Sequence, residues 1–148
     1  MRKALKKVLL PELSRIGFIG ASSNFQRRSA ENLDLLSIQY WKYGGQFILE
    51  FARRKRGTLN TSWGEVQEQN IGVAHMSPLL RARLQQTLEA SEGLFRGFKF
   101  SGFGEDLANY IALANEVASL LPQVNAWLEN GVAGENIHTL GRSAQPIG

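Results

Sequence analysis

Two adjacent glycines, Gly44 and Gly45, separate two runs that are both rich in Leu, Ile, Phe, Tyr and Trp. Glycine readily adopts the positive φ angles that a two-residue hairpin turn requires. The pattern therefore predicts a β-hairpin over residues 32–43 and 46–54. A two-residue turn would place Ile38 opposite Phe51 and Tyr40 opposite Leu49.

The predicted hairpin has two chemically different faces, because side chains alternate across a strand. One face is apolar and consists of Leu36, Ile38, Tyr40, Phe47, Leu49 and Phe51. The other face is half polar and consists of Leu35, Ser37, Gln39, Trp41, Ile48, Glu50 and Ala52. Helices need an apolar surface to pack on, so we expect them on the first face.

Further strands should join this hairpin, because an isolated hairpin is marginally stable in water. The candidates are residues 24–29 and residues 94–103, which predict an antiparallel meander of three to five strands. Residues 3–16 and 105–128 have helical periodicity, and Pro122 should kink or split the second helix. The expected fold class is α+β, with an N-terminal and a long C-terminal helix packed on one face of the sheet.

Two shorter segments carry weaker signals. Gly17 followed by Phe18 is typical of a helix C-terminus, and residues 19–23 read as a loop of small residues. Residues 77–88 begin with Ser-Pro and repeat leucine every four positions, which favours a helix. The alternation of Leu, Ala and Leu with two arginines over 80–84 also fits a strand, and both interpretations stay open.

The chain has the size of one domain. Its 148 residues, 43% of them hydrophobic, can bury one sizeable core. We assign residues 1–129 to a single α+β domain. Residues 130–148 contain repeated glycine and little apolar content, which predicts a loosely held tail. Trp63, in the polar segment after the hairpin, is expected to anchor that segment to the core.

Composition predicts a soluble cytoplasmic protein. The chain has no cysteine, so it forms no disulfide and has no thiolate, which fits a reducing compartment. The apolar run near the N-terminus stops at Pro11, which is too short for a signal peptide, and no run is long enough to cross a membrane. We expect no membrane partner.

Charge is distributed unevenly along the chain. The net charge is +4, but residues 1–56 hold 12 Lys or Arg against 4 Asp or Glu, whereas residues 57–148 hold 5 against 9. A basic surface attracts acidic proteins or nucleic acid.

Several short motifs accompany the hairpin: Arg-Ile-Gly-Phe at 15–18, Phe-Gln-Arg at 25–27, Arg-Ala-Arg-Leu at 81–84 and Ala-Trp-Leu-Glu at 126–129. In these motifs the chain resembles a family of small bacterial domains, the domain-of-unknown-function family 4304. This resemblance implies an α+β domain and a strand at 81–84. It supplies no catalytic residues, although relatives of this size look like immunity or toxin-associated proteins.

No pattern of residues points to chemistry. His75 and His138 are far apart in the chain, and neither belongs to a metal-ligand motif, so we expect no metal and no cofactor. The chain has no phosphate loop and no nucleophile motif. We therefore expect a non-enzymatic protein.

The leading hypothesis is a protein-binding domain of the immunity type, which covers a toxin or effector carrying an acidic patch. Exposed aromatic residues are enriched at interfaces, so the binding surface is placed around Trp41. Its predicted residues are Gln39, Trp41, Ile48, Glu50, Arg53, Arg54, Lys55 and Arg56. The alternative is a nucleic-acid-binding module that uses Arg27, Arg28, Arg53, Arg54, Lys55 and Arg56.

Overall fold

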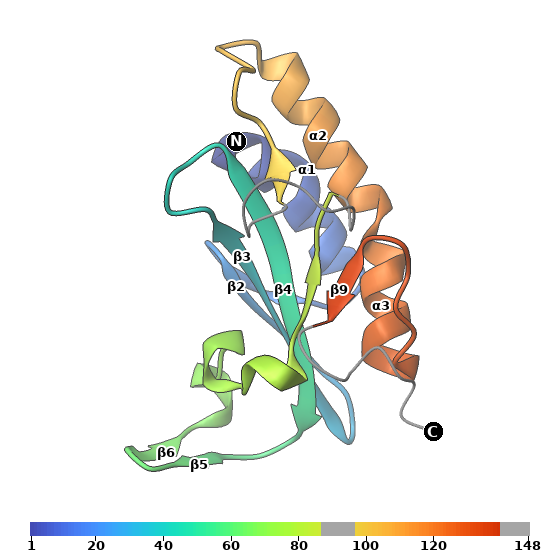
Figure 1. Ribbon diagram of the computed structural model, residues 1–148. Helices are drawn as coiled ribbons and strands as arrows, with labels where there is room; N and C mark the ends of the chain where they lie inside the picture. The colour runs from blue at the N-terminus through green and yellow to red at the C-terminus, as the bar shows by residue number, and fades with distance from the viewer. Residues whose placement is uncertain (87–96, 140–148) are drawn as a thin grey trace.

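The computed structural model describes residues 1–86 and 97–139 (Figure 1). The helices are α1 (Arg2–Arg15), α2 (Leu107–Ser119) and α3 (Leu121–Asn130), and three single 3-10 turns are η1 (Glu68–Asn70), η2 (Val73–His75) and η3 (Pro78–Leu80). The strands of the main sheet are β1 (Ile19–Ala21), β2 (Asn24–Arg28), β3 (Asn32–Tyr40), β4 (Gln46–Lys55), β7 (Ala82–Leu84), β8 (Phe98–Lys99) and β9 (Ile137–Thr139). A separate two-stranded ribbon consists of β5 (Leu59–Thr61) and β6 (Gly64–Val66).

The main sheet is antiparallel at each pairing between described strands. Its order is β1-β2-β3-β4-β7-β9, with β8 pairing to the other end of β4. The α+β class and the antiparallel sheet are confirmed, but the residues that the structure describes contribute seven strands to the sheet instead of three to five. The additional strands have only two or three residues each, and such short strands show no measurable periodicity.

Helix α1 carries one apolar stripe, at Leu5, Leu9 and Leu13, which is buried against the sheet. The helix ends just before Gly17 and Phe18, where the sequence predicts its C-terminus. The amide of Phe18 donates to the carbonyl of Leu13 (2.9 Å), the amide of Gly17 donates to Ser14 (3.0 Å), and Gly17 has φ +102°. This is a Schellman C-cap, and it turns the chain directly into β1.

The register of the central hairpin differs from the prediction by two residues. Phe51 lies opposite Leu36 instead of Ile38, and Tyr40 lies opposite Phe47. The turn is longer because Trp41 already pairs with Gln46 (2.9 Å), which leaves residues 42–45 as the loop. An even shift moves no side chain to the other face of the sheet. The predicted division into two faces is therefore correct.

The helix face of the sheet holds the main core (Figure 1). The hairpin residues Leu36, Phe47, Leu49 and Phe51 are buried there against all three α-helices. Helices α2 and α3 replace the single long helix that periodicity predicts. They join at Leu120, and Pro122 lies in the first turn of α3, where its missing N–H breaks no helical hydrogen bond. The predicted split is confirmed.

The opposite face, which we call the second face, is also covered over part of its area. Ile71, Val73 and Met76 pack on Leu33, Leu35 and Ala52 to form a smaller apolar cluster. Leu59 and Val66, at the base of the β5–β6 ribbon, pack against this cluster, and the turn of the ribbon projects away from it (Figure 1). Trp63, at its turn, is 97% exposed, so the expectation that it anchors the segment to the core was wrong.

Two expectations about the C-terminal half need correction. Residues 82–84 form β7 on the edge of β4, so the strand interpretation of 80–84 was right and the helical one was wrong; Ser77 caps only the short turn η3. Strand β9 then pairs with β7 and buries Ile137. Residues 137–139 therefore belong to the sheet and not to a loose tail. Residues 94–96 of the expected strand and 140–148 of the tail lie outside the described residues.

The packing of the helix face predicts the effect of truncating its central side chain. Phe51 is fully buried and contacts Trp127 edge-on, with ring centroids 5.5 Å apart. Phe51→Ala should lower the free energy of unfolding by about 3–5 kcal/mol, because a cavity remains. Denaturant titration measures this loss. The matched control, Trp63→Ala, should change the free energy of unfolding by less than about 0.5 kcal/mol. A loss below about 1 kcal/mol for Phe51→Ala would contradict the packing described for this side chain.

Candidate functional site

Glu50 is the centre of a buried polar cluster on the second face. Its side chain is 1% exposed and accepts hydrogen bonds from three residues. Arg83 Nε donates to Oε2 (2.7 Å), whereas Arg81 Nη1 (3.1 Å) and Gln39 Nε2 (2.9 Å) donate to Oε1. The strand register sets these contacts, because it places Arg83 directly opposite Glu50.

This cluster corrects the predicted binding surface. Ile48 and Glu50 are each 1% exposed, so they are not part of a surface that a partner can reach in this structure. Gln39 is half-buried, and Trp41 is half-buried with its ring edge-on to Tyr43. The sequence did not reveal that Arg83 of β7 and Arg81, directly before this strand, would both contact Glu50.

Asp34 organises a second ionic cluster, on the helix face of the sheet. Arg53 donates to both carboxylate oxygens (2.7 and 3.1 Å), and Arg27 Nε donates to one of them (3.0 Å). The hydrogen bonding of Arg53 to Asp34 raises the pKa of Arg53. Arg27 also donates to Asn125 Oδ1 (2.7 Å) and to the carbonyl of Ile16 (3.3 Å), and thereby connects the sheet to α3 and to the end of α1.

Glu68, in η1, holds the third ionic cluster. Arg56 donates to both of its carboxylate oxygens (2.9 Å each), and the amide of Gly57 donates to one (2.6 Å). Arg28 Nε lies 3.4 Å from the same carboxylate. The hydrogen bonds from Arg56 and Gly57 lower the pKa of Glu68 to about 2.

Most of the residues predicted to contact nucleic acid take part in these ionic clusters. Arg27 and Arg53 pair with Asp34, and Arg28 and Arg56 pair with Glu68. Arg54 is half-buried and donates to the carbonyl of Gly57 (2.7 Å), whereas Lys55 is exposed. Most of these guanidinium groups therefore bind the protein's own carboxylates and carbonyls.

The outer edge of the sheet offers a different candidate site. Strand β1 occupies one end of the sheet order, and no other strand in residues 1–86 or 97–139 pairs with its outer edge. All three of its residues are exposed, Ile19 to 81%. Gly20 is required there, because a Cβ would lie 2.1 Å from the Asn24 carbonyl oxygen of β2. Residues 19–23 were expected to be a loop, and this strand was missed.

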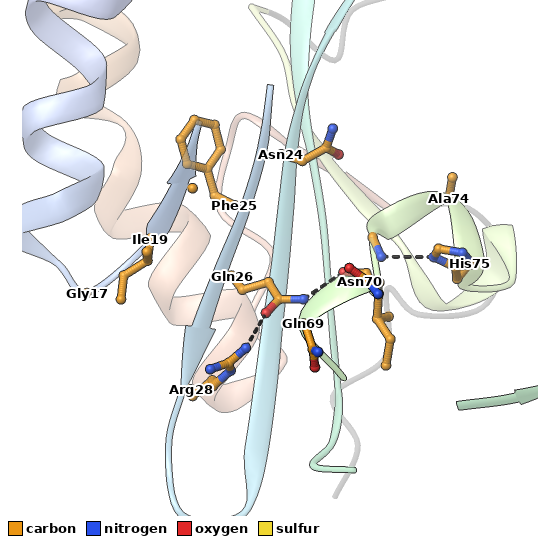
Figure 2. Close-up of a pocket in the computed structure, with 13 residues that line it drawn as sticks. Gly17, Ile19, Asn24, Phe25, Gln26, Arg28, Gln69, Asn70, Ala74 and His75 are labelled. Atoms are coloured by element: carbon orange, nitrogen blue, oxygen red, sulfur yellow. Dashed lines mark hydrogen bonds between the residues drawn. The ribbon is translucent and has the colours of Figure 1, made fainter. Parts of the chain in front are cut away.

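A cavity of about 670 Å³ opens beside β1 on the second face (Figure 2). Its walls are β1 and β2 on one side and residues 69–75 on the other. Gln26 ties these walls together, because its Nε2 donates to the carbonyls of Glu68 and Ile71 (2.8 Å each). The amide of Gly72 donates to His75 Nδ1 (2.9 Å), which gives a neutral His75 its proton on Nε2.

A second cavity, of about 440 Å³, lies beside β1 on the helix face. Its walls are α1, residues 20–22 and the end of β3 at Ile38 and Tyr40. The guanidinium carbon of Arg2 lies 3.9 Å from the centre of the Tyr40 ring, a cation–π contact that fixes this arginine at the cavity. Lys6, one helical turn further on, also lines the cavity.

The two cavities share one electrostatic property. The charged residues lining them are Arg28 on the second face and Arg2 and Lys6 on the helix face, and neither lining contains Asp or Glu. The remaining polar groups are mainly amide side chains and His75, which donate hydrogen bonds. Arg28 already pairs with Glu68, so the cations that attract further negative charge to the edge strand are Arg2 and Lys6, on the helix face.

Comparisons of the chain with protein-family models, with curated proteins and with solved structures gave no match. In the described part of the chain, no helix has the length and apolar character needed to cross a membrane. The same residues contain no group of three or more His, Asp or Glu that could hold a metal ion.

The Glu50 cluster predicts a large stability effect. Glu50→Ala leaves two arginines without their buried partner and should lower the free energy of unfolding by about 3–5 kcal/mol. Denaturant titration measures the loss. Glu65→Ala, which removes an exposed carboxylate on β6, is the matched control and should change stability by less than about 0.5 kcal/mol. Equal small effects of both substitutions would show that the arginines do not depend on Glu50.

The Glu68 cluster predicts a pH effect. A carboxyl pKa lowered by folding means that Glu68 stabilises the protein above its unfolded pKa and that this contribution is lost as pH falls toward about 2. Carboxyl-carbon NMR titration should give Glu68 a pKa of about 2. Arg56→Gln should raise this pKa toward its ordinary value, whereas Lys55→Gln, which changes the exposed neighbouring cation, should leave it in place. A pKa that does not respond to Arg56→Gln would contradict the cause given.

Proposed function

We propose that this protein is a non-enzymatic protein-binding domain that recognises an extended segment of its partner along β1. In this mode of recognition, called β-augmentation, the partner adds a strand to an exposed sheet edge. Main-chain hydrogen bonds to the edge supply affinity, and pockets for alternate side chains supply specificity.

The observation that carries the proposal is the position of β1 between two cavities. Alternate residues of an edge strand direct their N–H and C=O groups away from the sheet, and these groups form a template for a further strand. Proteins commonly cover such edges or place charged side chains on them. In β1 the residues are Ile19, Gly20 and Ala21, which are uncharged and exposed.

The electrostatics of the edge favour an acidic protein partner over nucleic acid. Arg2 and Lys6, which line the helix-face cavity, are placed to meet carboxylates on a segment that lies along β1. The arginines nominated for phosphate contacts are mostly engaged with Asp34 and Glu68. Nucleic-acid binding stays the alternative, and the salt dependence of binding to duplex DNA tests it.

Within this class, we further propose an immunity-type role in the cytoplasm, in which the domain neutralises a toxin or effector by covering its surface. The resemblance to domain-of-unknown-function family 4304 and the single-domain size support this role. The absence of cysteine supports the compartment. The biological role is inferred from analogy with that family, whereas binding is inferred from the geometry of the β1 edge.

Strand addition predicts an alternating requirement for backbone N–H groups in the ligand. A random-heptapeptide phage library selected against the full chain supplies a binding peptide, which is then synthesised with N-methyl groups at either its odd or its even positions. One series should weaken binding at least about tenfold, because it removes hydrogen bonds to β1, while the other should bind like the parent. Amide NMR shifts at residues 19–21 locate the binding.

Two results would contradict the proposal. Both methylated series could bind like the parent, or the shifts could map to the Glu50 cluster or to the outer surface of the helices. Binding to duplex DNA with a steep fall in affinity on added salt, without peptide binding at β1, would favour the nucleic-acid alternative.

A further inference from the structure

A strand added beside β1 would place successive side chains in different cavities. Ile19 and Ala21 lie on the second face, because Ile19 pairs with Gln26 and Gln26 pairs with Leu35 of that face. Gly20 lies on the helix face, opposite Phe25. Side chains alternate along a strand, so the partner residue beside Gly20 enters the helix-face cavity, and its two neighbours enter the second-face cavity.

The helix-face cavity selects the charge of that central side chain. Arg2 and Lys6 line it four residues apart on α1, so both project from the same side of the helix. Leu5 and Ile38 are the buried apolar residues of its lining, which lower the local dielectric and strengthen a charge pair. A lysine from the partner would meet two cations, whereas a carboxylate would meet two opposite charges.

The geometry of the cavity also indicates how long the partner's side chain must be. A Cβ on Gly20 would collide with the Asn24 carbonyl oxygen and with Phe25, so β1 contributes no side chain here, and the two cations of the cavity come from the neighbouring helix. The partner residue must therefore reach from the sheet edge across to α1. Glutamate has one more methylene group than aspartate and is better suited to bridge this distance.

We infer that the domain selects an extended segment with a glutamate beside Gly20, held by Arg2 and Lys6; this inference rests on the proposed function. A second copy of this chain is a poor occupant of the edge. Two β1 strands placed side by side would bring Arg2 and Lys6 of both copies toward one another, and their charges repel.

The experiment uses the full chain and synthetic heptapeptides of alternating Thr and Val, identical except for a central Glu, Gln or Lys. Binding is followed through the amide NMR shifts of residues 19–21. Two variants of α1 carry the same loss of charge. Arg2→Gln with Lys6→Gln removes the cations of the cavity, whereas Lys3→Gln with Lys7→Gln removes two exposed cations of the same helix that line neither cavity.

The Glu peptide should bind the parent chain about tenfold more tightly than the Gln peptide, and the Lys peptide more weakly still. This preference for Glu should disappear in the Arg2→Gln, Lys6→Gln variant and persist in the Lys3→Gln, Lys7→Gln variant. An equal preference for the Glu peptide in the two double variants would overturn the inference, because the selection would then reflect the overall charge of the protein.

Other outcomes separate the inference from the proposed function. Shifts at 19–21 with equal affinity for all three peptides would retain strand addition and overturn the glutamate assignment. The absence of shifts at 19–21 with every peptide would overturn both. Shifts at 19–21 that depend on protein concentration without peptide would assign the edge to a second copy and overturn the acidic partner.

Discussion

The pairing of β3 with β4 positions most other elements of the molecule. Strands β2, β7 and β8 all add to these two strands, and β1 and β9 extend the sheet beyond them. Both faces of the pair are buried, one by the helices and the other by residues 71–76, Arg81 and Arg83. A slip of one residue would expose the helix-face core and bury polar side chains in its place, so the register is strongly determined.

The same arrangement of charge occurs three times around this sheet. Asp34, Glu50 and Glu68 each pair with two arginines, which come from different segments for Asp34 and Glu68 and from one segment for Glu50. Asp34 connects β2 to β4, Glu50 connects β4 to β7, and Glu68 connects η1 to the ends of β2 and β4. Asp34 and Glu50 are buried, and a buried carboxylate is tolerated only with close partners, so these two clusters specify which segments lie side by side. Much of the basic first third therefore serves internal ion pairs, while Arg2, Lys3, Lys6 and Lys7 of α1 are exposed.

Local features of the fold could be predicted from the sequence. The faces of the hairpin follow from a period of two and survive an even error in register, whereas the loop length does not follow, because two glycines fit loops of two or four residues. The caps at Gly17 and Pro122 depend only on neighbouring residues. The contacts of Arg81 and Arg83 with Glu50 span 31 and 33 positions, and no local pattern reports them. Strand β1 has three small or exposed residues and therefore no pattern of burial, so the candidate site at this edge was found only from the structure.

The proposed function requires β1 to accept a further strand. Cross-strand nuclear Overhauser effects between the Gly20 backbone and a bound Glu-containing heptapeptide test this strand addition most directly, because they require backbones a few ångströms apart. Strand addition should give a set of short contacts between backbone protons along residues 19–21, in one register, with the peptide glutamate near Lys6. Peptide contacts confined to side chains of the helices or of the second face, with none along the backbone of 19–21, would contradict it.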